Sequence, residues 1–408
     1  MTAVDFLSRA VIENPWPVFQ RLRDDDPAHW NAGLGGWCVT RYQDVTAAFK
    51  DPRYSSDRIR PFIQGQRRVA TEVVKPLGDV LSLWMVFNDA PLHTRLRKLT
   101  HQAFSPKSIA RLRPAIEAIV AELIDDLPRR GEVDFIDAFA YPLPSRVISF
   151  ILGVPRADIP RLKRWSDDVA EFVLVSRSDA SKYGRAAASL VQMCAYFSEL
   201  IERRRASPED KVIDDLISAH EDNDALSLEE LVSTVVLLLF AGHETTTHFI
   251  ANGWWALATH PEQYRSLAAG WRDPQALDDA LDEMLRWDGP SIMQLRVAAQ
   301  DIELHGRLIR QGERIFLFNA AANRDPREFS NPETFDVRRA DAHRNIAFGY
   351  GGHFCLGAHL AKLEGAIAFP ALLEQLGETR LLDAAPCWND SLVIRGMQRM
   401  PVAIERRG

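Results

Sequence analysis

The sequence predicts a mainly α-helical protein with small β-sheets, an α+β fold. A long apolar stretch runs from Ser227 to about His260, and amphipathic helical patterns cover residues 106–127, 144–152, 159–175 and 183–205. Short alternating segments occur only near 35–45, 290–315 and the C-terminus. We therefore expect small β-rich regions at about 30–60 and 290–320 and helices over most of the rest.

The long stretch has a clear helical start, because Ser227 and Glu230 are spaced as a capping box. It spans about 50 Å at 1.5 Å per residue, and a helix this long and apolar should run through the interior. Residues 241–247, AGHETTT, interrupt it with a carboxylate and three hydroxyls. These polar groups predict a local kink or widened groove that holds water or a ligand.

Residues 348–364 read FGYGGHFCLGAHLAKLE and place Cys355 between glycine-rich turns and a helical pattern. Gly349, Gly351 and Gly352 allow positive φ and the close approach of a large flat ligand. A cysteine at a helix N-terminus favours the thiolate, which can ligate a metal. The alternative is a buried structural cysteine, the usual state of a free cysteine.

Composition excludes several classes of protein. The chain has 408 residues, 46% of them hydrophobic, and 49 basic against 56 acidic residues give a net charge of −7. That balance does not favour binding of nucleic acid or an anionic membrane. Four widely spaced cysteines and the lack of a signal peptide or of a long apolar run predict a soluble protein of the reducing cytoplasm.

Other segments carry more local predictions. Residues 57–87 look irregular and predict a loop that covers a substrate. Asp89 is a candidate N-cap for a helix that carries His93 and Arg97 four residues apart on one face. A polar break at 176–182 predicts a lid above Phe172.

The C-terminal half of the sequence predicts an ion pair and two hairpins. Glu283 and Arg286 are spaced as an ion pair on one helical face. The segments after residue 301 predict a hairpin that turns at Gly306 and Gly312. Residues 392–397 and 402–405 predict a last hairpin.

The spacing of Phe348, Gly351, Cys355 and Gly357 resembles the haem-ligand signature of the cytochrome P450 family. The resemblance extends over nearly the whole chain. It implies a single haem domain over residues 1–408, with the long central helix over a haem b group. Cys355 would hold the iron, and O2 would bind on the opposite side.

The resemblance also implies roles for other residues. Glu244 and Thr245 match the family's acid–alcohol pair, in which Thr245 positions the bound oxygen and Glu244 shuttles protons. Glu283, Arg286 and Arg339 match a structural triad that holds the loop leading to the cysteine. The implied haem contacts are His93, Arg97 and Arg296 with His353 on the propionates, and Ala241, Gly349 and Gly357. The candidate substrate pocket consists of Leu83, Phe87, Phe172, Leu237, Leu238, Ile292, Met293, Leu295, Val393 and Ile394.

The implied activity is a monooxygenase that hydroxylates or epoxidises an apolar small molecule such as a terpenoid, steroid, fatty acid or macrolide-like compound. Electrons would come from a separate ferredoxin or flavodoxin that docks on this chain, and the chain is expected to be a monomer. Two alternatives are a peroxide-driven peroxygenase and a non-catalytic haem-thiolate protein that binds a gas or ligand. A basic patch of Arg95, Lys98, Arg344 and Lys362 is expected to steer the donor. Three arginines at the entrance could anchor a substrate carboxylate: Arg58, Arg60 and Arg177.

Overall fold

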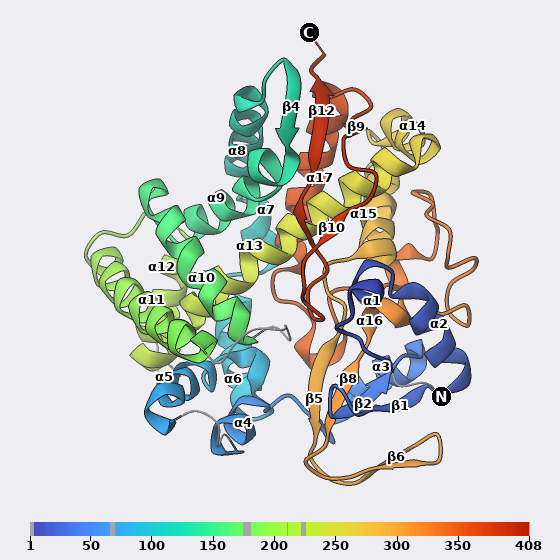
Figure 1. Cartoon of the computed structure of the whole chain (residues 1–408). Helices are drawn as coiled ribbons and strands as arrows, with labels where there is room; N and C mark the ends of the chain where they lie inside the picture. The colour runs from blue at the N-terminus through green and yellow to red at the C-terminus, as the bar shows by residue number, and fades with distance from the viewer. Residues whose placement is uncertain (1–3, 66–69, 174–180, 210, 222–225, 408) are drawn as a thin grey trace. The chain divides into compact units, whose positions relative to one another are not determined.

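Helices dominate the computed structural model, which describes residues 4–65, 70–173, 181–209, 211–221 and 226–407 (Figure 1). The described residues form four small sheets, so the predicted fold class is confirmed. Two compact units can be distinguished. Unit 1 comprises Met1–Tyr54, Leu112–Pro144 and Glu244–Gly408, and unit 2 comprises Ser55–Arg111 and Ser145–His243.

Unit 1 holds most of the β-structure. Its strands are β1 (Ala28–Asn31), β2 (Gly36–Val39), β4 (Arg130–Asp134), β5 (Gln294–Ala298), β6 (Ile302–Leu304), β7 (Arg307–Ile309), β8 (Arg314–Leu317), β9 (Arg380–Leu381), β10 (Cys387–Trp388), β11 (Met397–Arg399) and β12 (Pro401–Glu405). Its helices include α1 (Arg9–Glu13), α2 (Trp16–Asp25), α3 (Tyr42–Lys50), α8 (Arg113–Asp126), η2 (Ile136–Ala140), α14 (Pro261–Gly270), α15 (Pro274–Asp288), α16 (Asn319–Ala322), η4 (Ala342–Arg344), η5 (Gly351–His353) and α17 (Ala358–Gln375).

The largest sheet has the order β1-β2-β8-β5-β3, in which β3 is Tyr54–Ser55. Strand β2 runs parallel to β8 and places Val39 opposite Leu317. One face is apolar, because Val39, Ile315 and Leu317 join a buried cluster with Phe49 of α3. Strands β6 and β7 form the predicted hairpin, which turns at Gly306 with φ 69°.

The predicted C-terminal hairpin is wrong. Strand β12 pairs with β4 and β9, and β11 pairs with β10. Residue Ile394 instead forms a bridge with Ser291. The sequence marks these segments as extended, but the partner of a strand depends on contacts that are distant in the chain.

The helices of unit 1 pack closely where glycine replaces a side chain. At Gly365 of α17, an added Cβ would lie 2.8 Å from the Phe249 ring, and at Gly253 it would lie 2.7 Å from the Phe369 ring. Such approaches allow α17 to lie against the long helix α13 (Leu228–Thr259). The predicted capping box begins α13, since Ser227 and Glu230 exchange hydrogen bonds of 2.9 and 3.2 Å.

Unit 2 is helical. It contains α4 (Ile59–Gly65), α5 (Thr71–Leu81), η1 (Met85–Phe87), α6 (Leu92–His101), α7 (Pro106–Ala110), η3 (Arg156–Asp158), α10 (Ile159–Val173), α11 (Ser181–Ala206) and α12 (Val212–Glu221). Helix α9 (Pro142–Ile151) and α13 each have residues in both units. Residues 176–180 of the predicted lid lie outside the described residues, and its last two residues already belong to α11, which begins at Ser181.

Two predictions in unit 2 are wrong. Residues 57–87 are largely helical where the structure describes them, because the apolar side chains Val74, Leu77 and Leu81 recur at helical spacing and are buried. Helix α6 has Pro91, not Asp89, at its N-cap. The Asp89 carboxylate instead accepts hydrogen bonds from the Ser55 hydroxyl (2.5 Å) and the Ser56 backbone N–H (2.8 Å).

None of the described helices combines the length and the apolar character that a membrane span requires.

Glu364 of α17 is a buried acid. Its side chain is 1% exposed, and among the described residues neither carboxyl oxygen has a hydrogen-bond partner. Burial raises the pKa of Glu364 well above its ordinary value of 4.5, because the charged form loses its hydration. The carboxyl is therefore protonated in the folded protein at pH values where it is ionised in the unfolded chain.

We expect Glu364 to make the free energy of unfolding fall as pH rises from 4.5 to the folded-state pKa. In that interval only the unfolded chain releases the proton. Glu364→Gln should flatten this pH dependence, as measured by urea unfolding of the purified protein between about pH 5 and about pH 8. The control is Glu374→Gln in the same helix, where the exposed carboxylate pairs with Arg272. Equal pH slopes in the wild type and Glu364→Gln would contradict the prediction.

Candidate active site

Cys355 lies in a tight loop between η5 and α17. Its backbone N–H donates to the Phe348 carbonyl over 2.9 Å, which closes the turn. Gly349 and Gly351 hold φ values of 73° and 69°, the left-handed region that favours glycine. Helix α17 begins at Ala358 with Gly357 as N-cap, so Cys355 precedes the helix by three residues.

Cys355 differs from the other three cysteines, all of which the structure describes. It is exposed, whereas Cys38 is buried and Cys194 and Cys387 are partly buried. Burial raises the pKa of the Cys38 thiol, and it raises that of Cys194 to about 11. The alternative that Cys355 is a buried structural cysteine is therefore wrong.

The loop fits a flat prosthetic group such as haem. At Gly357 an added Cβ would meet the Cys355 Sγ at 4.0 Å and no other atom within that distance, so the space beside the sulfur is open. The loop lies on α3, because a Cβ at Gly351 would lie 3.0 Å from the Phe49 carbonyl oxygen. A thiol beside glycines on a fixed loop is the donor arrangement that a thiolate-ligated haem requires.

Arg296 and the cysteine loop contact the same residue of unit 1. The Arg296 guanidinium, on a side chain only 5% exposed, lies 5.3 Å from the centre of the Phe49 ring and donates to the Leu295 carbonyl. The loop that carries His353 packs against the Phe49 carbonyl. The structure therefore brings two predicted propionate ligands, Arg296 and His353, to the same part of unit 1.

Two further predicted haem ligands lie in unit 2. His93 and Arg97 are four residues apart on α6, as predicted, and His93 is buried.

A buried ion-pair network holds the segment that leads to Cys355. Glu283 bonds Arg286 through two hydrogen bonds of 2.5 and 2.9 Å, and the Arg339 Nε lies 3.1 Å from Glu283. The Glu283 and Arg286 side chains are 0% exposed. The predicted triad of these three residues is present.

The network reaches the cysteine loop through one asparagine. Arg286 donates to the Asn323 carbonyl over 3.0 Å, and the Asn323 side-chain oxygen accepts from the Ile346 backbone N–H over 2.8 Å. Ile346 stands two residues before Phe348, where the turn closes. The triad therefore fixes the start of the loop.

The polar segment of α13 forms an accessible window, residues 240–245, in a mostly buried helix. Ala241 is exposed and Glu244 and Thr245 are partly buried, whereas residues 231–239 and 246–254 are buried throughout. Every residue of α13 is α-helical. His243 is the buried exception in the window, since its ring bonds the Leu239 carbonyl, and burial lowers its pKa.

Three of the predicted pocket residues meet in unit 1. The Ile292 N–H donates to the Val393 carbonyl over 2.9 Å, and Ile394 bridges Ser291. Met293 and Leu295 continue from Ile292 into β5.

The other predicted pocket residues lie in unit 2. Phe87 stacks on Trp84, and Trp84 also contacts Phe240 of α13. Phe172 contacts Phe62 and Tyr183. Leu237 and Leu238 are buried in α13, and Leu83 is partly buried.

Several of the predicted cationic side chains interact with neighbouring side chains. Arg60 bonds Asp57 and the Asn88 side chain, and the Arg58 guanidinium lies over the Phe87 ring. Arg177 lies outside the described residues.

In the predicted donor patch, Arg95 pairs with Glu230, Arg344 with Glu328, and Lys362 with Asp278 and Asp282. Three of its four members therefore do not present unpaired charge.

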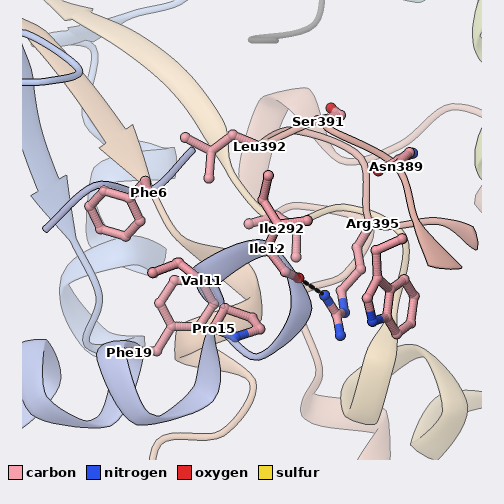
Figure 2. A pocket seen from close by; sticks show the side chains of 11 residues that line it. Phe6, Val11, Ile12, Pro15, Phe19, Ile292, Asn389, Ser391, Leu392 and Arg395 are labelled. Carbon is pink, nitrogen blue, oxygen red and sulfur yellow. Dashed lines mark hydrogen bonds between the residues drawn. The ribbon is translucent and has the colours of Figure 1, made fainter. Parts of the chain in front are cut away.

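Sequence reasoning missed a small apolar pocket in unit 1, shown in Figure 2. Ile292 and Leu392 line it together with Phe6, Val11 and Phe19 of the N-terminal segment. No sequence signal could have shown it, because these residues are far apart in the chain.

Comparisons with known proteins agree with this geometry. A sequence model described as Cytochrome P450 matches residues 38–269 and 275–377. Over 99% of its length the chain is 39% identical to a vitamin D(3) 25-hydroxylase of Pseudonocardia autotrophica, and 37% identical to a 6-deoxyerythronolide B hydroxylase of Saccharopolyspora erythraea, covering 97% and 100% of those proteins. The solved structure of P450BioI with a fatty-acyl acyl carrier protein matches with TM-score 0.88 and 34% identity, covering 97% of this chain and 99% of that one.

Removal of the Glu283 carboxylate should destabilise the fold strongly. Glu283→Ala leaves two buried guanidiniums without their shared partner, a change that typically costs about 3–5 kcal/mol. We expect a lower denaturant midpoint and a lower ratio of haem to protein absorbance. The control, Glu117→Ala, removes an exposed carboxylate that pairs with Arg113 and should change little. Wild-type values for both quantities in Glu283→Ala would contradict the role of the triad.

Proposed function

Because the chain belongs to the cytochrome P450 family and is a P450 monooxygenase, we propose that it hydroxylates or epoxidises a large apolar molecule with electrons from a separate donor. The observation that carries the proposal is the exposed Cys355 on its glycine loop, at one end of the network of buried triad contacts. P450 monooxygenases use O2 and redox partners and bind small-molecule substrates. When bound, the haem, proposed as haem b, supplies the activation of O2.

Cys355 is the proposed iron ligand. The tight turn fixes its backbone, and the absence of a side chain at Gly357 would leave room beside the sulfur for a bulky group. Arg296 and His353 in unit 1, and His93 and Arg97 in unit 2, are the proposed donors to the propionates, because cationic groups form strong hydrogen bonds to carboxylates. Ala241, Gly349 and Gly357 are proposed as contacts that offer little steric bulk.

Glu244 and Thr245 are the proposed catalytic residues. Both belong to the accessible window of α13, where their side chains are partly buried and can exchange protons with water. The Thr245 hydroxyl would hold a proton near the reacting oxygen, and the Glu244 carboxylate would resupply it. The buried stretches on either side of the window limit the entry of further water.

The proposed substrate is of steroid or macrolactone size. Two similar proteins are named as hydroxylases of vitamin D(3) and of 6-deoxyerythronolide B, which are both large and apolar. The pocket residues Ile292, Val393 and Ile394 are aliphatic and are joined by backbone hydrogen bonds, which favours a shaped apolar surface over a polar anchor. The internal hydrogen bonds of Arg60 weaken the idea of a carboxylate anchor.

The proposed electron donor is a ferredoxin or flavodoxin that docks on the cysteine side. Tyr350 and Phe354 are exposed on the Cys355 loop, and the Lys50 ammonium lies 4.7 Å from the centre of the Tyr350 ring. Aromatic side chains with an adjacent cation are typical of a contact surface for an acidic partner.

The spectrum of the ferrous carbonyl form tests the proposed ligand. The wild type should show the red-shifted Soret band of thiolate ligation, and Cys355→Ala should lose it, because no sulfur remains to donate electron density. Cys387→Ala, which removes a partly buried thiol 3.5 Å from the Gln398 side chain, should keep the band. A histidine-type band in the folded wild type would refute the proposal.

Thr245→Ala should retain the haem spectrum but lose coupling. General acid–base contributions are about 10²–10⁴-fold, so product formed per NADPH should fall by roughly tenfold or more while hydrogen peroxide rises. Both products are measured against NADPH consumption. Thr259→Ala is the matched control, because that hydroxyl lies at the end of the same helix and bonds the Trp255 carbonyl. Unchanged coupling in Thr245→Ala would remove Thr245 from the mechanism.

A further inference from the structure

We propose that His248 is a positioning residue for substrate selection. Its imidazole ring supports the C-terminal loop, residues 391–396, and so sets where Val393 and Ile394 stand. The inference rests on the proposed function of this loop as part of the substrate pocket. It adds a determinant of specificity that is not itself among the pocket residues.

The C-terminal loop is tied to the N-terminal segment and to the end of α15 through Arg395. Arg395 donates to the Asp288 carboxylate over 2.6 Å and to the Ile12 carbonyl over 2.7 Å, the hydrogen bond drawn in Figure 2. Its guanidinium also lies 3.6 Å from the centre of the Trp388 ring. The Arg395 N–H donates to the Pro290 carbonyl. These contacts leave the loop little freedom to move.

Helix α13 holds the other side of the loop. The Asn252 side-chain amide donates to the Asp288 carbonyl over 2.9 Å and to the Arg395 carbonyl over 3.0 Å. One helical turn earlier, the buried His248 ring lies against Gly396. The loop is therefore fixed between the N-terminal segment and one face of α13.

The contact between His248 and Gly396 has a specific shape. A Cβ added to Gly396 would lie 2.1 Å from the His248 Nδ1 and 2.2 Å from both Cε1 and Cγ. Three ring atoms at nearly equal distance mean that the face of the ring, not its edge, covers the Gly396 Cα. The ring therefore fills the volume that any larger residue at position 396 would need.

The helical spacing connects this contact to the chemistry. His248 follows Thr245 by three residues and Glu244 by four, so its side chain is a neighbour of each of them on the surface of the helix. The thickness of the imidazole ring thus sets the height of the loop above the face that carries the acid–alcohol pair. A change of that height moves Val393 and Ile394 relative to Thr245.

The test is a double-mutant cycle of His248→Ala and Gly396→Ala in the haem-loaded protein. Dissociation constants for testosterone, myristic acid and phenylimidazole are measured by the shift of the ferric spectrum, together with the thermal unfolding midpoint. Gly396→Ala alone should weaken the best of these probes by about tenfold to a hundredfold and lower the midpoint, because overpacking forces the loop away. The double variant should recover most of both losses, because removal of the ring frees the space for the methyl group.

The matched control is Gly377→Ala, where an added Cβ meets no atom within 4 Å and should change neither quantity. Additive effects in the double variant would overturn the inference. If Gly396→Ala fails to fold, folding of the double variant is the compensation that supports it. His248→Ala alone should change the dissociation constants of the three probes by different factors. If all three constants change by the same factor, the inference is also overturned.

Failure of the inference and failure of the proposed function are distinguishable. A wild type without the thiolate carbonyl band refutes the haem-thiolate function whatever the variants do. If the wild type, the two single variants and the double variant all show a normal band but the effects of the two substitutions are additive, only the role of His248 is refuted.

Discussion

The buried carboxylate of Glu283 is the interaction on which the rest of the site depends. It neutralises two guanidiniums in an interior where an isolated charge would be very costly. The two arginines in turn donate to the carbonyls of Asn323, Pro332 and Thr334, which belong to a segment with little regular secondary structure. An irregular backbone is held in place this way because its carbonyls find fixed donors. The cysteine loop starts from that fixed segment.

Stacked arginines and tryptophans tie the N-terminal segment to the same region. The Arg324 guanidinium lies 3.5 Å from the centre of the Trp16 ring and 3.6 Å from that of Trp287. Two rings this close to one carbon must lie on opposite faces of the guanidinium, so Arg324 is sandwiched between them. Burial lowers the pKa of Arg324 to about 10, and a contact with Glu333 offsets part of that effect. The charged Arg324 side chain thus packs between aromatic residues from segments that are far apart in the chain.

Helix α13 combines an unbroken backbone with a change of environment along its length. Its buried flanks supply packing, its accessible window supplies acid and alcohol, and Asn252 and His248 contact the C-terminal loop. One rigid element therefore places the proposed chemistry and part of the proposed specificity. Side chains are placed more precisely on a helix than on a loop, because the helical backbone that carries them is rigid.

The sequence by itself determined what depends on local spacing. It predicted the capping box of Ser227 and Glu230, the hairpin at Gly306 and the turn that carries Cys355, because caps and glycine turns act within a few residues. Helical periodicity was harder to see at residues 57–87, where the irregular pattern predicted a loop, yet buried apolar side chains stabilise helices there. Only the tertiary structure decided which strand pairs with β12, which carboxylates compensate Arg95, Arg344 and Lys362, and that His248 lies against Gly396. Those contacts join residues up to hundreds of positions apart, and chain packing, not local preference, selects among the partners that a sequence offers.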